Sequence, residues 1–162
     1  MKIAFKMKTY NILSIDEFKT IIGNNSRLLG IDPGKRNMGF AICDENQKVA
    51  TPLKIVEKVK FELLTKEINH IILDHNIKGI IIGNPINMDG TLGKSSQSVT
   101  DFAKKLSTNV TVPISLWDER LSSEASFKIT KELGTNVSNR MNKLDKNAAA
   151  FILQGAIDYL SN

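Results

Sequence analysis

The stretch that most constrains the fold is the apolar hexapeptide GIIIGN, residues 79–84. It carries no polar side chain before its last position, and such an uninterrupted run is typical of a strand buried on both faces. Strands of this kind occur in sheets that helices cover on both sides, where parallel strands are joined through helices. The hexapeptide therefore predicts an α/β domain built around a central sheet.

Three short β-type segments precede this strand, with only a few residues between them. They are LLGID, NMGFAIC and VATPLKIV, and their links, a Pro-Gly turn and the polar stretch DENQK, favour antiparallel neighbours. After residue 84, helical and β-type patterns alternate, and VPISLW is a second buried strand. We expect a five-stranded mixed sheet, three antiparallel strands and then two parallel ones, flanked by helices.

Helical patterns fill most of the chain between these strands. Residues 60–75 place Phe61, Leu64, Ile68, Ile71 and Ile72 on one helical face. Further helices are predicted over residues 95–106, 122–134 and 145–160, the last opening at Asp145. Trp117 is expected to pack under a helix. His70 and His75 are five residues apart, which does not suit a metal-binding pair on one helical face.

The first 27 residues predict an N-terminal appendage, followed by one domain over residues 28–162. Ser14 is a candidate N-cap for a short helix, with Glu17 three positions on and Gly23 at the end. The segment has five basic residues against two acidic ones. This excess suits contact with nucleic acid, and a solvated tail is the alternative interpretation.

Length, charge and cysteine content narrow the class of protein. A chain of 162 residues with 41% hydrophobic residues can bury one real core. Its net charge of +5 favours a polyanionic partner. The single cysteine, Cys43, cannot form an internal disulfide and is expected in the core, which suits a cytoplasmic protein. No apolar run approaches the roughly 18 residues of a membrane span, so no membrane contact is expected.

Acidic residues gather where the predicted parallel strands end. Asp32 ends LLGID, Asp118 and Glu119 follow ISLW, and Asp145 opens the last helix. Sites in such sheets form at the carboxyl ends of the strands, so these carboxylates are expected to converge. Grouped carboxylates repel one another unless they bind a cation, and Mg²⁺, with Mn²⁺ as a substitute, prefers oxygen ligands. The pattern predicts metal-dependent cleavage of phosphodiester bonds.

Four successive segments resemble the motifs of the YqgF family, in the family's order. They are GIDPGKRNMGFAICD, IIIGNPINMDGTLGKSSQSVTDFAKKL, WDERLSSEAS and LDKNAAAFILQGAIDYL, and together they span about residues 28 to 160. The resemblance implies a ribonuclease H-like fold. It also implies a cytoplasmic bacterial nuclease that trims the 5′ end of precursor 16S ribosomal RNA, in a family formerly described as Holliday junction resolvases by analogy with RuvC. Ser122 and Ser123 depart from the threonine common at their positions.

The resemblance also implies catalytic residues. Asp32, the pair Asp118 and Glu119, and Asp145 match the acids of the family's motifs. Neighbours along a strand face opposite sides, so only one residue of the pair is expected to bind metal. We favour Glu119 because its longer side chain reaches across from a strand end, and Asp118 then orients Arg120. The predicted metal ligands are Asp32, Glu119 and Asp145.

Polar residues and glycines beside these acids are candidate substrate contacts and turn positions. The predicted substrate-binding side chains are Lys35, Arg36, Asn84, Asn87, Arg120 and Lys143. The predicted structural glycines are Gly34, Gly39, Gly83 and Gly90. Gly34 allows the turn after Asp32, and Gly39 allows close approach of another backbone. A solvated hairpin is the alternative interpretation for Lys35 and Arg36.

Each acid also has a simpler interpretation, and other functions compete with the nuclease. Asp145 suits an N-cap, Asp32 a turn, and Glu119 a surface ion pair. The segment GTLGKS mimics a nucleotide-binding phosphate loop, but Met88 occupies the position of its first glycine. A DNA endonuclease that cuts four-way junctions, or a non-catalytic nucleic-acid-binding module, remains an alternative. The sequence does not decide whether the substrate is RNA or DNA, or whether the protein is a monomer or a homodimer.

Overall fold

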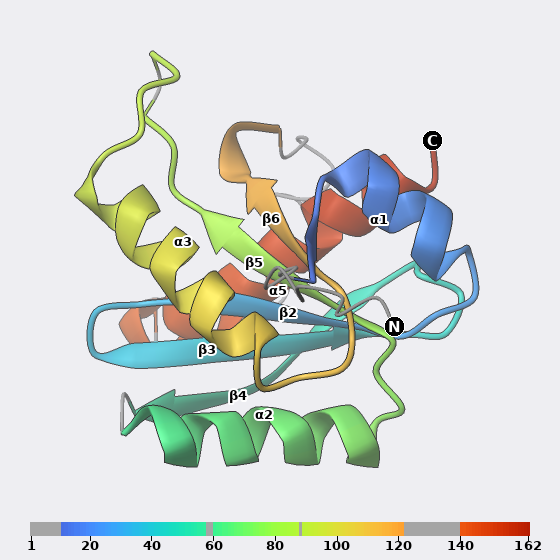
Figure 1. The fold of residues 1–162 in the computed structure, drawn as a ribbon, viewed down its shortest axis with the longest axis horizontal. Helices are drawn as coiled ribbons and strands as arrows, with labels where there is room; N and C mark the ends of the chain where they lie inside the picture. The colour runs from blue at the N-terminus through green and yellow to red at the C-terminus, as the bar shows by residue number, and fades with distance from the viewer. Residues whose placement is uncertain (1–10, 58–59, 88, 122–139) are drawn as a thin grey trace, which may run out of the picture.

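The computed structural model describes residues 11–57, 60–87, 89–121 and 140–162, and in the last range side chains are described from residue 147 onward. Its centre is a six-stranded mixed sheet with the order β1-β6-β5-β2-β3-β4 (Figure 1). The strands are β1 (Ile12–Leu13), β2 (Leu28–Pro33), β3 (Asn37–Cys43), β4 (Ala50–Glu57), β5 (Gly79–Asn84) and β6 (Ile114–Asp118).

The strand directions confirm the predicted mixed sheet. β2, β3 and β4 form an antiparallel meander, and β5 and β6 add to β2 in parallel. The sixth strand, β1, pairs in parallel with the outer edge of β6 and was not predicted. A strand of only two residues carries no alternation that a sequence pattern can reveal.

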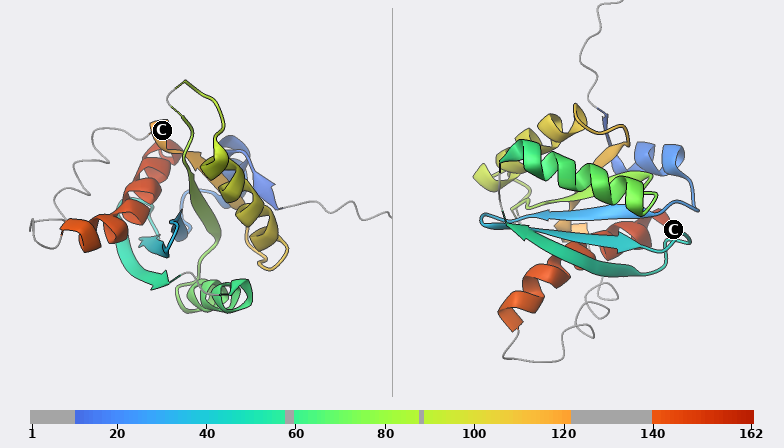
Figure 2. Two further views of the ribbon diagram at one scale, coloured as in Figure 1. Left: turned by 90° about the vertical axis from the view of Figure 1, so that its left-hand side faces the viewer. Right: turned by 90° about the horizontal axis from the view of Figure 1, so that it is seen from below.

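Helices cover both faces of the sheet (Figure 2). They are α1 (Ile15–Ile22), α2 (Phe61–Asp74), α3 (Lys94–Ser107) and α5 (Arg140–Leu160), with the 3-10 turn η1 (Glu119–Leu121) after β6. The apolar residues of α2 and α3 share one core cluster, and those of α1 and α5 share another. The hexapeptide of β5 lies between the two and is buried at every position, as its composition predicted.

Alternation along the strands sorts side chains between these two clusters. Ile31 of β2 and Ile82 of β5 pack on the side of α2 and α3. Leu28 of β2 and Ile81 of β5 pack on the side of α1 and α5. Successive residues of a strand face opposite sides of the sheet, so these positions determine the side that each following residue faces. We call these two faces of the sheet the α3 side and the α5 side.

The N-terminal segment packs against the sheet through β1 and α1. The Ser14 hydroxyl caps α1 by accepting from the backbone N–H of Glu17 at 3.2 Å, and Gly23 ends it with φ of 74°, as predicted. Phe18 is fully buried, and a Cβ added to Gly79 would lie 2.5 Å from its ring. Residues 12–22 are therefore in close contact with β5 and β6.

The last helix begins earlier than the sequence predicted. α5 starts at Arg140, so Asp145 lies inside the helix and its interpretation as an N-cap is wrong. The physical reason is that the preceding residues include Arg, Met, Lys and Leu, which are strong helix formers. The helix predicted over residues 122–134 lies outside the described residues.

Several side-chain predictions in the core are confirmed. Trp117 is 1% exposed and packs edge-on against Tyr159 of α5, with ring centroids 5.7 Å apart. Cys43 is buried, and burial raises the pKa of its thiol to about 11, so it packs as an apolar side chain. None of the helices in the described ranges has the length and apolarity that crossing a bilayer requires.

Candidate active site

The candidate site lies at the edge where β2, β5 and β6 end. β5 and β6 are in register up to the pair Asn84 and Asp118, and β2 runs alongside β5 through the pair Ile31 and Ile82. Asp32 follows Ile31 directly and pairs across the meander with the buried Gly39. This register brings Asp32 and Asp118 to one edge of the sheet, and Glu119 follows Asp118 directly.

The acids divide between the two sides of the sheet. Asp32 follows Ile31, which faces the α3 side, so Asp32 faces the α5 side. Trp117 packs on the α5 side, so Asp118 faces the α3 side. Glu119 begins η1, and its Oε1 atom lies 2.9 Å from where a Cβ on Gly83 would stand. The missing side chain of Gly83 thus leaves room for the Glu119 carboxylate beside Ile152 of α5.

The electrostatics of Glu119 reflect this crowding. Burial raises the pKa of the Glu119 carboxyl, and the nearby charges of Asp32 and Asp118 raise it further. A carboxylate that is partly buried and repelled by two others is stabilised in its charged form when a cation binds beside it. Oxygen ligands of this kind match the preference of Mg²⁺.

Asp118 is engaged differently from Glu119. The guanidinium of Arg120 donates from Nε to both carboxylate oxygens at 3.0 and 3.1 Å, and from Nη2 to Oδ2 at 2.8 Å. The Arg120 backbone N–H adds a bond to Oδ1 at 3.0 Å. These hydrogen bonds from Arg120 lower the pKa of the Asp118 carboxyl. The geometry agrees with the expectation that Asp118 orients Arg120.

The third predicted acid, Asp145, is placed only through the backbone of α5. It stands four residues before Ala149 and seven before Ile152, both of which are buried in the α5-side cluster. Positions separated by four and seven residues are in helical register, so Asp145 is in register with these two residues along the α5 backbone. Its side chain, like that of Lys143, lies outside the described part. Among the described side chains, no group of three His, Cys, Asp or Glu residues forms a metal cluster.

The predicted turn and hairpin residues lie around this edge. A Cβ on Gly34 would overlap the carbonyl oxygen of Asn37, so the turn after Asp32 needs glycine. Lys35 and Arg36 are exposed at the tip of the same hairpin. Gly90 has φ of 87°, a conformation that glycine adopts most readily.

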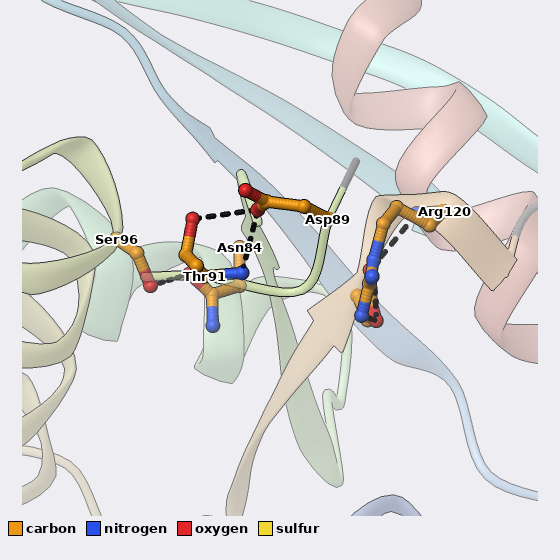
Figure 3. A network of polar contacts seen from close by, with 6 residues as sticks. Asn84, Asp89, Thr91, Ser96 and Arg120 are labelled. Carbon is orange, nitrogen blue, oxygen red and sulfur yellow. Dashed lines mark hydrogen bonds and ion pairs between the residues drawn. The ribbon is translucent and has the colours of Figure 1, made fainter. Parts of the chain in front are cut away.

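The loop after β5 is ordered by its own polar contacts (Figure 3). The Asn84 Oδ1 atom accepts from the Ser96 hydroxyl at 2.8 Å, and the Asn87 amide donates to Thr91 Oγ1 at 3.0 Å. Asp89 accepts from the Thr91 hydroxyl at 2.6 Å and from the Thr91 backbone N–H at 2.9 Å. Ser96, Asp89 and Thr91 were not predicted from sequence. The Asp-Gly-Thr turn was the only local signal that could have suggested the last two.

Comparison with known proteins places the chain in a family. A family model described as RuvX: Holliday junction resolvase matches residues 26–159. The chain belongs to the RuvX family. A relative from Pelagibacter ubique, named "Putative pre-16S rRNA nuclease", is 49% identical over 151 residues, which are 93% of this chain and 100% of that protein. A relative of the same name from Ruegeria pomeroyi is 40% identical over 149 residues, covering 92% and 97% of the two chains.

Solved structures confirm the ribonuclease H-like fold. Thermus thermophilus RuvC in complex with a Holliday junction substrate matches with a TM-score of 0.56 at 10% identity, over 85% of this chain and 96% of that one. A second structure of Thermus thermophilus RuvC matches with a TM-score of 0.52 at 10% identity, over 83% and 96% of the two chains. At this identity the likeness concerns the fold alone.

Proposed function

We propose that this RuvX-family protein is a divalent-metal-dependent nuclease that hydrolyses phosphodiester bonds at the 5′ end of precursor 16S ribosomal RNA. The observation that carries the proposal is the closeness of Glu119 to Asp32 on the α5 side of the sheet edge, where burial and the charge of Asp32 raise the pKa of the Glu119 carboxyl. The names of relatives up to 49% identical support the choice of substrate. Processing of this RNA in bacteria implies a cytoplasmic location.

The residues present fit a hard divalent cation. Asp32 and Glu119 offer carboxylate oxygens, and Asp145 belongs to α5, in helical register with the buried Ala149 and Ile152. These three residues would hold the metal, Mg²⁺ or its substitute Mn²⁺. When bound, such ions activate a water molecule and stabilise the leaving oxygen in phosphodiester hydrolysis.

The acids also argue against a module that only binds nucleic acid. Carboxylates facing an anionic strand repel it, and this repulsion weakens binding unless a cation screens them. A binding module gains nothing from placing the partly buried Glu119 beside Asp32. A nuclease needs both carboxylates to hold its metal. The same arrangement suits a DNA endonuclease, so the substrate must be decided by experiment.

A parallel cleavage assay tests the proposal. A 5′-extended fragment of precursor 16S ribosomal RNA and a four-way DNA junction are each incubated with the protein and Mg²⁺, and the products are mapped. We expect cleavage of the RNA fragment. Cleavage of the junction alone would support the DNA endonuclease. If neither substrate is cut with Mg²⁺ or Mn²⁺, the nuclease proposal is wrong. Trimming of one RNA end requires only a monomer, whereas a two-fold junction favours a symmetric dimer.

A further inference from the structure

Two side chains on the α3 side of the sheet edge, Arg120 and Asn84, are each hydrogen-bonded to a neighbouring side chain. Each of them also has one donor atom without an acceptor among the described residues. Arg120 uses Nε and Nη2 on Asp118, and within the described chain its Nη1 has no acceptor. Asn84 accepts from Ser96 through Oδ1, and among the described residues its Nδ2 has no acceptor. Each donor is thus fixed in direction and has no acceptor among the described residues.

The two donors belong to one small region. Asn84 is the register partner of Asp118, the residue that holds Arg120. A Cβ on Gly90, in the loop that follows Asn84, would lie 3.6 Å from Arg120 Nη1. Asn84 is only 9% exposed and Ser96 only 1%, so the packing around them holds this hydrogen-bonded pair in place.

The charges around Arg120 favour a neutral ligand over a phosphate. Two carboxylates, Asp118 and Asp89, interact with the single guanidinium, so these three groups sum to one minus two, or −1. The Asp89 Oδ1 atom is occupied by Thr91, whereas Oδ2 has no hydrogen-bond partner among the described residues. The region therefore offers two donors and one acceptor without net positive charge. A hydroxyl group, which both accepts and donates, matches this set.

We propose that Arg120 Nη1, Asn84 Nδ2 and Asp89 Oδ2 bind ribose 2′-hydroxyl groups of the substrate, so that the α3 side of the edge selects RNA over DNA. The inference rests on the proposed function, because that function supplies a polynucleotide at this edge. A 2′-hydroxyl is the group by which a protein distinguishes RNA from DNA at a given site. Asp118 and Ser96 act as positioning residues, since they fix the directions of Arg120 and Asn84.

Binding in the presence of a chelator tests this proposal without any cleavage. The affinity of the full chain is measured by fluorescence anisotropy for a precursor 16S RNA fragment and for the same sequence in 2′-deoxy form. We expect the protein to prefer the RNA by about tenfold, the scale of one or two net hydrogen bonds. We also expect the ratio of the two affinities to change little with salt, because neutral contacts release no counterions.

Substitutions separate the ribose contacts from general effects. Asn84→Ala is expected to lower RNA affinity toward the level of the deoxy strand, whose own affinity stays unchanged. Arg120→Ala also removes a positive charge that neutralises Asp118, so it is expected to weaken both strands but the RNA by more. Ser96→Ala, which removes only a hydroxyl, is expected to lose most of the same preference and to cause no further loss when combined with Asn84→Ala. Lys66→Gln, at an exposed position of α2, is the matched control and should leave the RNA-to-DNA ratio unchanged.

Two results would overturn the inference. One is a wild-type protein that binds both strands equally. The other is a set of variants, shown by thermal melting to be folded, that weaken RNA and deoxy strands alike, because that pattern indicates phosphate contacts. These results are independent of the cleavage assay. A protein that prefers RNA but never cuts it contradicts the proposed function alone, and one that cuts the precursor without ribose preference contradicts only this inference.

Discussion

At the residue scale, Asp118 and Glu119 are adjacent in sequence but face different surroundings. β6 ends at Asp118, and η1 begins at Glu119, so the chain changes direction between the two acids. Asp118 is neutralised by Arg120 on the α3 side. Glu119 lies near Asp32 beside Gly83 on the α5 side. We infer that one acid holds a cationic side chain and the other a metal ion.

Asp32→Asn is expected to abolish Mg²⁺-dependent cleavage while RNA binding stays equal or becomes tighter. The substitution removes a metal ligand and one negative charge that repels the substrate, but it keeps the shape of the side chain. Cleavage and anisotropy assays measure the two effects. Asp74→Asn, which removes an exposed acid at the end of α2, is the control. Undiminished cleavage by the Asp32 variant would remove this residue from the site.

Glu119 makes the stability of the metal-free protein depend on pH. Burial, Asp32 and Asp118 raise its pKa above the ordinary 4.5, so the folded chain binds this proton more tightly than the unfolded chain does. The contribution of Glu119 to stability is therefore present below pH 4.5 and is lost as pH rises through the raised pKa. Glu119→Gln should remove this dependence and make the metal-free protein more stable at neutral pH.

Thermal melts in chelator, from below pH 4.5 to neutral pH, measure the difference in stability between the wild type and Glu119→Gln. Added Mg²⁺ should stabilise the wild type above the raised pKa and have a smaller effect on the variant. Identical pH profiles for the two proteins would show that Glu119 is not under electrostatic strain. The same variant is expected to lose cleavage activity.

At the element scale, the site depends on how closely α5 and η1 approach β5. Gly83→Ala would place a methyl group against Ile152 and 2.9 Å from Glu119 Oε1. We expect a loss of about 1–3 kcal/mol of stability from overpacking, together with strongly reduced cleavage because the carboxylate is displaced. Gly93→Ser is the control, because the neighbours of Gly93 are at ordinary contact distances and serine suits the N-cap of α3. Denaturant unfolding and cleavage rates give the two readouts.

The N-terminal helix provides a second prediction at this scale. Phe18→Ala is expected to cost about 3–5 kcal/mol of unfolding free energy, because Phe18 is fully buried against Gly79. Ile21→Ala on the same helix should cost little, since Ile21 is 63% exposed. Equal, small effects in urea denaturation would mean that the first 27 residues are a true appendage, as the sequence suggested.

The sequence predicted the main elements well because their patterns are local. The burial of GIIIGN, the helix at residues 61–74 and the cap at Ser14 follow from a few neighbouring residues each. β1 was missed because its position depends on pairing with β6, far along the chain. The contact of Ser96 with Asn84 was missed for a similar reason, since the intervening loop decides which α3 residue meets the strand end. The meeting of Asp32 and Glu119 could be predicted only through the topology.

At the scale of the whole molecule, we expect the fold not to depend on metal. Two apolar clusters, one on each face of the sheet, hold the helices in place. A chelator is therefore expected to stop cleavage without unfolding the protein. Circular dichroism and cleavage measured on the same chelated sample check this, and addition of Mg²⁺ should restore activity. Loss of helical signal on chelation would contradict this view of the core.

The parallel pairing of β1 with β6 joins the beginning of the chain to a segment near its end. Asn11, just before β1, donates its side-chain amide to the carbonyl of Thr111, which is 100 residues later. During synthesis on the ribosome, residues 11–13 emerge about 100 residues before β6 and lack this pairing partner until β6 has emerged. Closing so large a loop is slow compared with forming the β2–β3–β4 meander. β1 therefore docks much later than it is made, and until it does, the outer edge of β6 stays open to other strands.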